Sequence, residues 1–87
     1  MKISKVIIEK KIKEKVLTEH NVKSSGIKEI LLDNPYILRA KYGRYMALGF
    51  SQKYVTVIFE RIGDVAFVIT AYLSSDAQRK LDKGKRQ

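Results

Sequence analysis

The spacing of apolar residues changes near Pro35. Before this proline, apolar residues recur every three or four positions, and after it they tend to recur at every second position. The first spacing is typical of helices that bury one face, and the second is typical of strands. We therefore expect helices in the first part of the chain and a sheet in the second.

The segment before Pro35 predicts a short strand and two helices. The strand is expected over residues 5 to 8 and the first helix over residues 10 to 20. A turn over residues 21 to 25 leads to the second helix, for which Ser24 is a good N-cap. The apolar stripes consist of Ile12, Val16 and Leu17 in the first helix and of Ile27, Ile30 and Leu31 in the second. We expect the two helices to form a hairpin.

The segment after Pro35 predicts an antiparallel meander. Alternation is clear over residues 44 to 50, 54 to 59 and 65 to 71, and residues 36 to 40 can add an edge strand. The short connections between these strands fit antiparallel neighbours. In the first of the three, one face carries Met46, Leu48 and Phe50, and the other carries Tyr45, Ala47 and Gly49.

A final helix is expected to begin at Ser75. Ser75 and Gln78 match a capping box, and Ala77 and Leu81 are its core-facing residues. A chain of 87 residues has room for one core, so we expect a single domain over residues 1 to 87. The predicted class is α+β: a small antiparallel sheet of three to four strands plus a short amino-terminal strand, packed by the helical hairpin and the carboxy-terminal helix.

The composition excludes several kinds of site. The chain has no cysteine and one histidine, so it offers neither a disulfide nor a zinc-binding set, and we expect no metal and no cofactor. The amino-terminal apolar run at residues 6 to 8 is far too short for a signal or membrane segment. A cytoplasmic location without membrane contact is therefore expected.

Positive charge is concentrated in parts of the chain. Eighteen Lys and Arg face nine Asp and Glu, which gives a net charge of +9, and no acidic residue occurs between positions 34 and 59. That acid-free stretch contains Arg39, Lys41, Arg44 and Lys53, and the last predicted helix adds Arg79, Lys80 and Lys83. Such clustering favours RNA or another polyanion as a partner. The alternative is a lysine-rich surface that serves solubility alone.

The residues left for chemistry are bases, hydroxyls and one imidazole. The sequence has no phosphate-binding glycine loop and no Ser/His/Asp set, but metal-free RNA cleavage needs neither. His20 lies between Val16 and Leu17 on the apolar stripe of the first helix. It is either a partly buried histidine that favours the helix carboxy terminus or a catalytic or RNA-contacting residue.

The basic and aromatic residues of the sheet also allow two interpretations. Arg39, Lys41 and Arg44 form either a phosphate-binding rim or a solvated edge that resists strand pairing. Tyr45 and Tyr72 lie near strand ends, where they either stack on unpaired RNA bases or pack within the sheet. Alternation places Thr70 beside Val68 as an ordinary strand residue.

Several segments together resemble BrnT-like toxins. Residues 15 to 22 and 33 to 35 are similar to that family's opening, K-x-x-x-K-H-G-V followed by N-P-P. Residues 44 to 49, 57 to 60 and 68 to 72 resemble its three strand motifs, in the same order. The chain departs from the family at Asn21, which replaces a glycine, at Gln52-Lys53, which replaces a glycine and an arginine, and at Tyr72, where many members carry an arginine.

The resemblance implies a fold similar to RelE-type ribonuclease toxins. It also implies the toxin half of a toxin-antitoxin pair, which cleaves RNA without a metal and is silenced by a cognate DNA-binding antitoxin. The leading hypothesis assigns catalysis to His20, Arg44, Tyr72 and Arg79, and RNA binding to Arg39, Lys41, Lys53, Lys80 and Lys83. The alternatives are a non-catalytic RNA- or protein-binding module of the same fold and a purely structural subunit. A homodimer is one assembly that the sequence allows.

Overall fold

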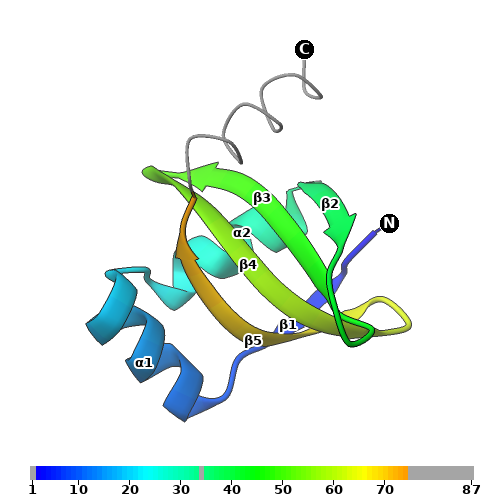
Figure 1. Ribbon diagram of the computed structural model, residues 1–87, viewed down its shortest axis with the longest axis horizontal. Helices are drawn as coiled ribbons and strands as arrows, with labels where there is room; N and C mark the ends of the chain where they lie inside the picture. Colours follow the sequence, from blue (N-terminus) through cyan, green and yellow to red (C-terminus); the bar gives the residue numbers. More distant parts are fainter. Residues whose placement is uncertain (1, 34, 75–87) are drawn as a thin grey trace.

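The computed structural model describes residues 2–33 and 35–74, which form two helices and one five-stranded sheet (Figure 1). The elements are β1 (Lys5–Ile7), α1 (Lys10–His20), α2 (Ser24–Leu32), β2 (Tyr36–Arg39), β3 (Tyr45–Ser51), β4 (Lys53–Ile62) and β5 (Val65–Leu73). The strand order is β1-β5-β4-β3-β2, with β1 parallel to β5 and every other pair antiparallel. The α+β prediction is confirmed over this part of the chain. The predicted helix from Ser75 lies outside the described residues.

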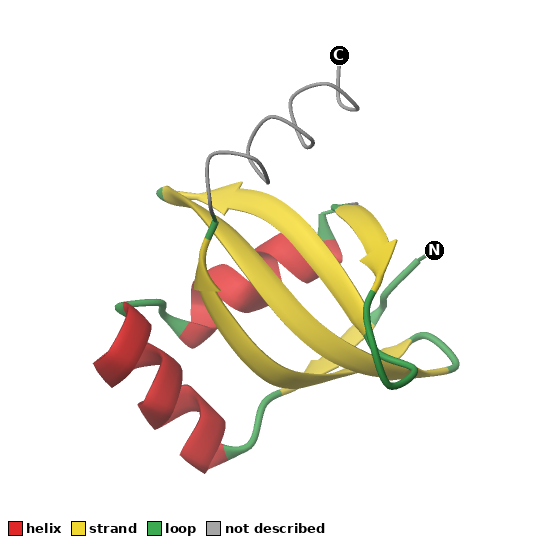
Figure 2. Ribbon diagram, in the orientation of Figure 1, coloured by secondary structure: helices red, strands yellow, loops and turns green. Residues whose placement is uncertain are grey.

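Both helices pack on the sheet. In the view of Figure 2, α2 crosses behind the sheet and α1 lies beside β5. The main contacts of α1 are with β5, and those of α2 are with β3 and then β1. The helices touch each other less than they touch the sheet. The two helices of the predicted hairpin are therefore held together mainly through the sheet, with little direct packing between them.

Helix α1 ends at a left-handed residue. Asn21 has a φ of 54°, its N–H donates to the Leu17 carbonyl at 3.1 Å, and the Val22 N–H donates to the Val16 carbonyl at 3.1 Å. The bond from Asn21 to Leu17 is that of the αL cap, in which asparagine sometimes takes the place of glycine. The predicted cap of α2 is wrong by one position, because Lys23 is the N-cap without a side-chain bond.

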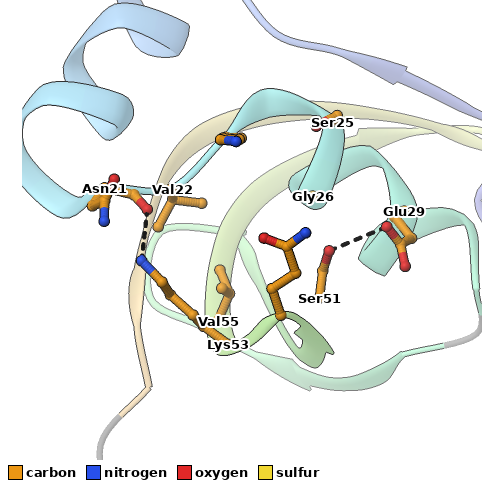
Figure 3. Close-up of a pocket in the computed structure, with 10 residues that line it drawn as sticks. Asn21, Val22, Ser25, Gly26, Glu29, Ser51, Lys53 and Val55 are labelled. Carbon is orange, nitrogen blue, oxygen red and sulfur yellow. Dashed lines mark hydrogen bonds between the residues drawn. The ribbon is translucent and has the colours of Figure 1, made fainter.

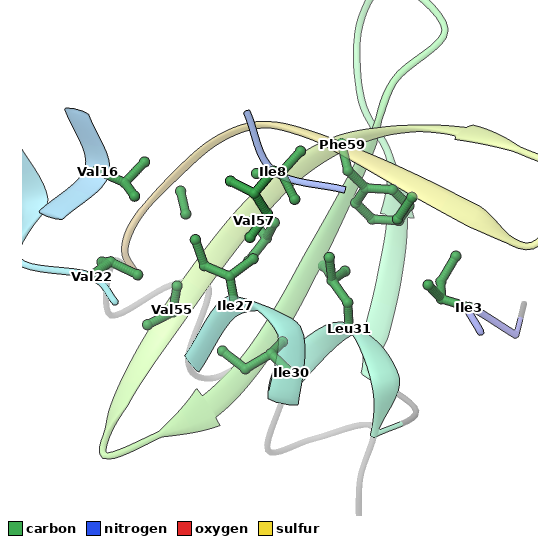
Figure 4. Close-up of a cluster of buried hydrophobic side chains, with 14 residues drawn as sticks. Ile3, Ile8, Val16, Val22, Ile27, Ile30, Leu31, Val55, Val57 and Phe59 are labelled. Carbon is green, nitrogen blue, oxygen red and sulfur yellow. The ribbon is translucent and has the colours of Figure 1, made fainter. Parts of the chain in front are cut away.

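The core lies between the helices and the inner face of the sheet, the face toward them (Figure 4). Its buried residues are Ile3, Ile8, Val16, Val22, Ile27, Ile30, Leu31, Ala47, Val55, Val57, Phe59, Ala66, Val68 and Ala71. The predicted stripe of α2 is confirmed. In α1, Val16 is buried and Ile12 packs at the margin, but Leu17 is 48% exposed, so its predicted place in the core is wrong.

A bulge on β5 changes which face its last residues occupy. Ile58 pairs with Thr70, but Phe59 pairs with Val68, so Ile69 is the extra residue. Paired residues of antiparallel strands share a face of the sheet. Thr70 and Val68 therefore lie on opposite faces of the sheet rather than on the same face. Simple alternation predicted the reverse, because it allows for no inserted residue.

Gly49 lets α2 approach β3 closely. As predicted, Gly49 shares a face with Tyr45 and Ala47, and this is the inner face. A Cβ atom at position 49 would lie 2.5 Å from the Cγ2 of Ile30. The absence of a side chain at this position therefore sets the distance between helix and strand.

We expect Gly49→Ala to lower the free energy of unfolding by about 1–3 kcal/mol, because the added methyl overpacks the contact with Ile30. Urea denaturation followed by circular dichroism measures the change. Combining it with Ile30→Ala, which removes the Cγ2 and Cγ1 atoms that the new methyl would meet, should cost less than the sum of the two single changes. Strict additivity would show that Ile30 is not the residue displaced.

The turn between β4 and β5 holds the start of β1. The Asp64 carbonyl accepts from the N–H groups of Ser4 at 2.9 Å and Lys5 at 3.4 Å, and the Ser4 hydroxyl donates to the Asp64 carboxylate. The Ser4 hydroxyl, then the backbone of Asp64 and the charge of Lys2, hold the pKa of this carboxyl below its ordinary value.

We expect Ser4→Ala to raise the pKa of Asp64 toward its ordinary value, as measured by an NMR pH titration. A carboxyl whose pKa is lowered on folding stabilises the protein at pH values above the ordinary aspartate pKa. That stabilisation is lost as the pH falls through the folded-state pKa. The variant should therefore lose less stability on acidification than the wild type does. An unchanged titration in Ser4→Ala would contradict the assigned cause, and Ser25→Ala is the control.

Candidate nucleic-acid interface

The end of α1 brings His20 beside the end of β5. The His20 and Tyr72 ring centroids are 6.4 Å apart, and their planes are inclined by 59°. His20 is partly buried, and its Nε2 lies 3.9 Å from the Glu19 Oε2, at the outer limit of an ion pair. An imidazole and a phenol, both able to exchange protons, thus lie next to each other at one corner of the molecule.

Buried hydroxyl groups hold the end of β5 in place. Tyr72 pairs with Thr56 on the outer face of the sheet, the face opposite the two helices. The Thr56 and Ser74 hydroxyls form a buried hydrogen bond of 2.9 Å, and the Ser74 N–H donates to the Tyr54 carbonyl at 3.0 Å. These bonds fix the strand just beyond Tyr72.

A cation belongs to the same corner. The Nζ of Lys53, the first residue of β4, donates to the carbonyl of Asn21 at 3.3 Å. Because Asn21 follows His20 directly, the ammonium group lies against the residue next to His20. We call His20, Asn21, Lys53 and Tyr72 the His20 corner. The structure thus brings together three of the nine predicted site residues, namely His20, Lys53 and Tyr72.

A polar pocket of about 420 Å³ adjoins the His20 corner (Figure 3). It lies between the end of α1, the start of α2 and the turn from β3 to β4. Lys23 and Lys53 line it, and Glu29, the carboxylate among its described lining residues, accepts a hydrogen bond from the Ser51 hydroxyl at 3.1 Å. The pocket therefore extends the positively charged surface beside the corner.

Arg44 lies at the opposite end of the sheet. It precedes Tyr45 and, by alternation, shares the outer face with Met46. It is four residues, or about 13 Å, along β3 from Leu48, which lies level with Tyr72 across the sheet. The Arg44 Nε is buried and has no hydrogen-bond partner. The structure therefore separates Arg44 from the other two described catalytic candidates.

A second basic group surrounds the start of β3. Arg39 pairs with Tyr45, which places its side chain on the face opposite Arg44, and Lys41 lies exposed in the loop between them. Arg61 joins this group, with its Cζ 5.8 Å from the Tyr45 ring centroid. Arg61 was not among the predicted site residues because it lies between the predicted strands 54 to 59 and 65 to 71, whereas β4 continues to Ile62.

Tyr45 is a packing residue. Its ring stacks on Phe59 at 5.7 Å, with an interplanar angle of 27°, and it contacts the core. The packing interpretation of Tyr45 therefore fits the structure.

Arg79, Lys80 and Lys83 lie outside the described residues. Within residues 2–33 and 35–74, no three His, Cys, Asp or Glu side chains gather as metal ligands do, and neither helix is long and apolar enough to span a membrane.

Comparison with solved structures gives a match over most of the chain. The crystal structure of the Brucella abortus ribonuclease toxin BrnT aligns with a TM-score of 0.67 and 21% sequence identity. The alignment covers 83% of this chain and 97% of that one. No protein-family model and no curated protein sequence matches this chain. The structural match shows that the chain has a BrnT-like fold, as its sequence motifs predicted.

We expect Thr56→Val to lower the free energy of unfolding by about 1–3 kcal/mol, because it leaves the buried Ser74 hydroxyl without this partner. The Tyr72 ring resonances should shift in NMR spectra as the end of β5 loosens. Thr70→Val, a partly exposed change on the same face, should alter neither stability nor spectrum as much. Equal effects of the two variants would contradict the special role of the Thr56 to Ser74 bond.

Proposed function

We propose that this protein is the toxin component of a toxin-antitoxin pair and cleaves RNA without a metal ion. The observation that carries the proposal is the pairing of His20 with Tyr72 beside Lys53, on a BrnT-like fold. Imidazole, phenol and ammonium groups supply the base, the acid and the charge that such a reaction needs.

In the proposed reaction, the ribose 2′-oxygen attacks the adjacent phosphorus. The His20 imidazole accepts the 2′-hydroxyl proton, the bond from phosphorus to the 5′-oxygen breaks, and the Tyr72 hydroxyl donates a proton to that leaving oxygen. Lys53 stabilises the charge of the phosphorane. The products are a 2′,3′-cyclic phosphate and a free 5′-hydroxyl, and exchange with water restores both side chains.

Other basic residues are proposed to hold the RNA along the sheet. Arg44, about 13 Å from the level of Tyr72, is too far along the strand for the same phosphate and would contact another one of the same RNA strand. Arg39 and Lys41 would extend this track. Arg79, Lys80 and Lys83 are proposed to add contacts from the carboxy-terminal segment. Each phosphate contact should make binding more sensitive to salt.

A toxin that cleaves the RNA of the cell that produces it needs an inhibitor there. We therefore propose a cognate antitoxin that binds DNA and covers the His20 corner, and a cytoplasmic location where RNA is accessible. The net charge of +9 favours an acidic surface on that partner. A homodimer is the assembly proposed for the free protein.

Purified protein incubated with single-stranded RNA in excess chelator should cut it. His20→Ala should lower the cleavage rate by about 10²–10⁴-fold, the usual contribution of a general base. Tyr72→Phe, which keeps the ring but removes the acid, should slow it as well. Lys13→Ala, a solvent-facing change on α1, is the control and should cut like the wild type.

Intact RNA at every wild-type concentration, together with normal growth on expression, would rule out the enzyme. The second candidate function is a non-catalytic RNA-binding module. It is favoured by Tyr72, which stands where many members of the family carry an arginine. It predicts salt-sensitive RNA binding with no cleavage, and binding that Tyr72→Arg strengthens.

A further inference from the structure

The hairpin between β2 and β3 displays an aromatic ring at its tip. Tyr42 is 85% exposed and has a φ of 62°, followed by Gly43 with a φ of 70°. The Arg44 N–H closes the turn by donating to the Lys41 carbonyl at 3.3 Å. Two successive positive φ values are the mark of a type I′ turn, whose first central position normally holds Asn, Asp or Gly. A bulky aromatic residue is an outlier there.

The surroundings of Tyr42 are cationic. Lys41 and Arg44 are its neighbours in the loop, and Arg39 lies at the end of β2. On the adjoining end of β4, Glu60 is exposed, and on the neighbouring turn Asp64 is hydrogen-bonded to Ser4. Figure 1 shows the two turns side by side at the same end of the sheet.

We infer that Tyr42 is a stacking platform for one base of single-stranded RNA, with Lys41 and Arg44 at the flanking phosphates. This inference rests on the proposed RNA-binding function. Stacking on an exposed aromatic ring accepts any base, and cations beside the ring bind the backbone. Bases within an RNA duplex are not splayed out, so duplex RNA cannot use the platform.

A nucleic acid fits this tip better than a protein partner does. Residues 40 to 44 carry two cations and no carboxylate, which suits the phosphates of a nucleic acid. Tyr42 also lies in the turn beyond Arg44, which is already about 13 Å along the strand from Leu48, the residue level with Tyr72. The platform would thus grip RNA far from the proposed cleavage point and favour strands long enough to reach both.

The test measures RNA binding separately from cleavage. In a His20→Ala background, fluorescence anisotropy gives the affinity for single-stranded RNA of about 12 nucleotides and for a duplex of equal length. Tyr42→Asn suits the turn and should unfold at the same temperature or a higher one, while single-strand affinity falls about tenfold. Tyr42→Phe should bind like the parent, and so should Ile62→Ala, an exposed apolar change at the adjoining end of β4.

Single-strand affinity that is unchanged in a folded Tyr42→Asn variant would overturn the inference. So would an equal loss for duplex RNA, or a loss confined to binding of a co-expressed partner protein. The proposed cleavage is judged separately, in the wild-type protein with chelator. If the protein binds RNA through Tyr42 but never cleaves it, the proposed enzymatic activity is contradicted and the stacking platform is supported.

Discussion

The packing of α2 against the inner face of the sheet is the contact on which the rest of the structure depends. Ile27, Ile30 and Leu31 supply the largest apolar surface that a helix brings to this core, and all three are buried. Ile30 fits because Gly49 has no side chain. Burial of each such side chain is worth about 1.5–3 kcal/mol, a large share of the stability of a small domain.

The position of α2 also determines where the His20 corner lies. A short connection joins α2 to α1, and the left-handed Asn21 turns the chain so that the end of α1 meets β5 and Lys53. The bulge at Ile69 then directs Tyr72 to the outer face. His20, Lys53 and Tyr72, which are distant in sequence, thus lie at one corner of the molecule. The packing of α2, the helix cap at Asn21 and the bulge at Ile69 together place them there.

Much of this fold could be predicted from local pattern. The bounds of α1, the stripe of α2 and the faces of β3 follow from periodicity, which reports burial directly. Leu17 could not be placed, because the sheet covers only part of the stripe on α1. The bulge carries no local signal, and the partner of β1 is set by tertiary packing.

His20, Lys53 and Tyr72 were candidates from residue type, but their proximity depends on the fold, and Arg61 gave no signal at all.

The pairing of β1 with β5 has a consequence for synthesis of the protein. Lys5 pairs with Val65 and Ile7 with Phe67, so β1 leaves the ribosome long before the strand with which it pairs. Contacts of such sequence separation form late and slow folding. A nascent chain therefore cannot close this sheet until β5 has been translated, and the His20 corner, which needs the end of β5, is assembled later still.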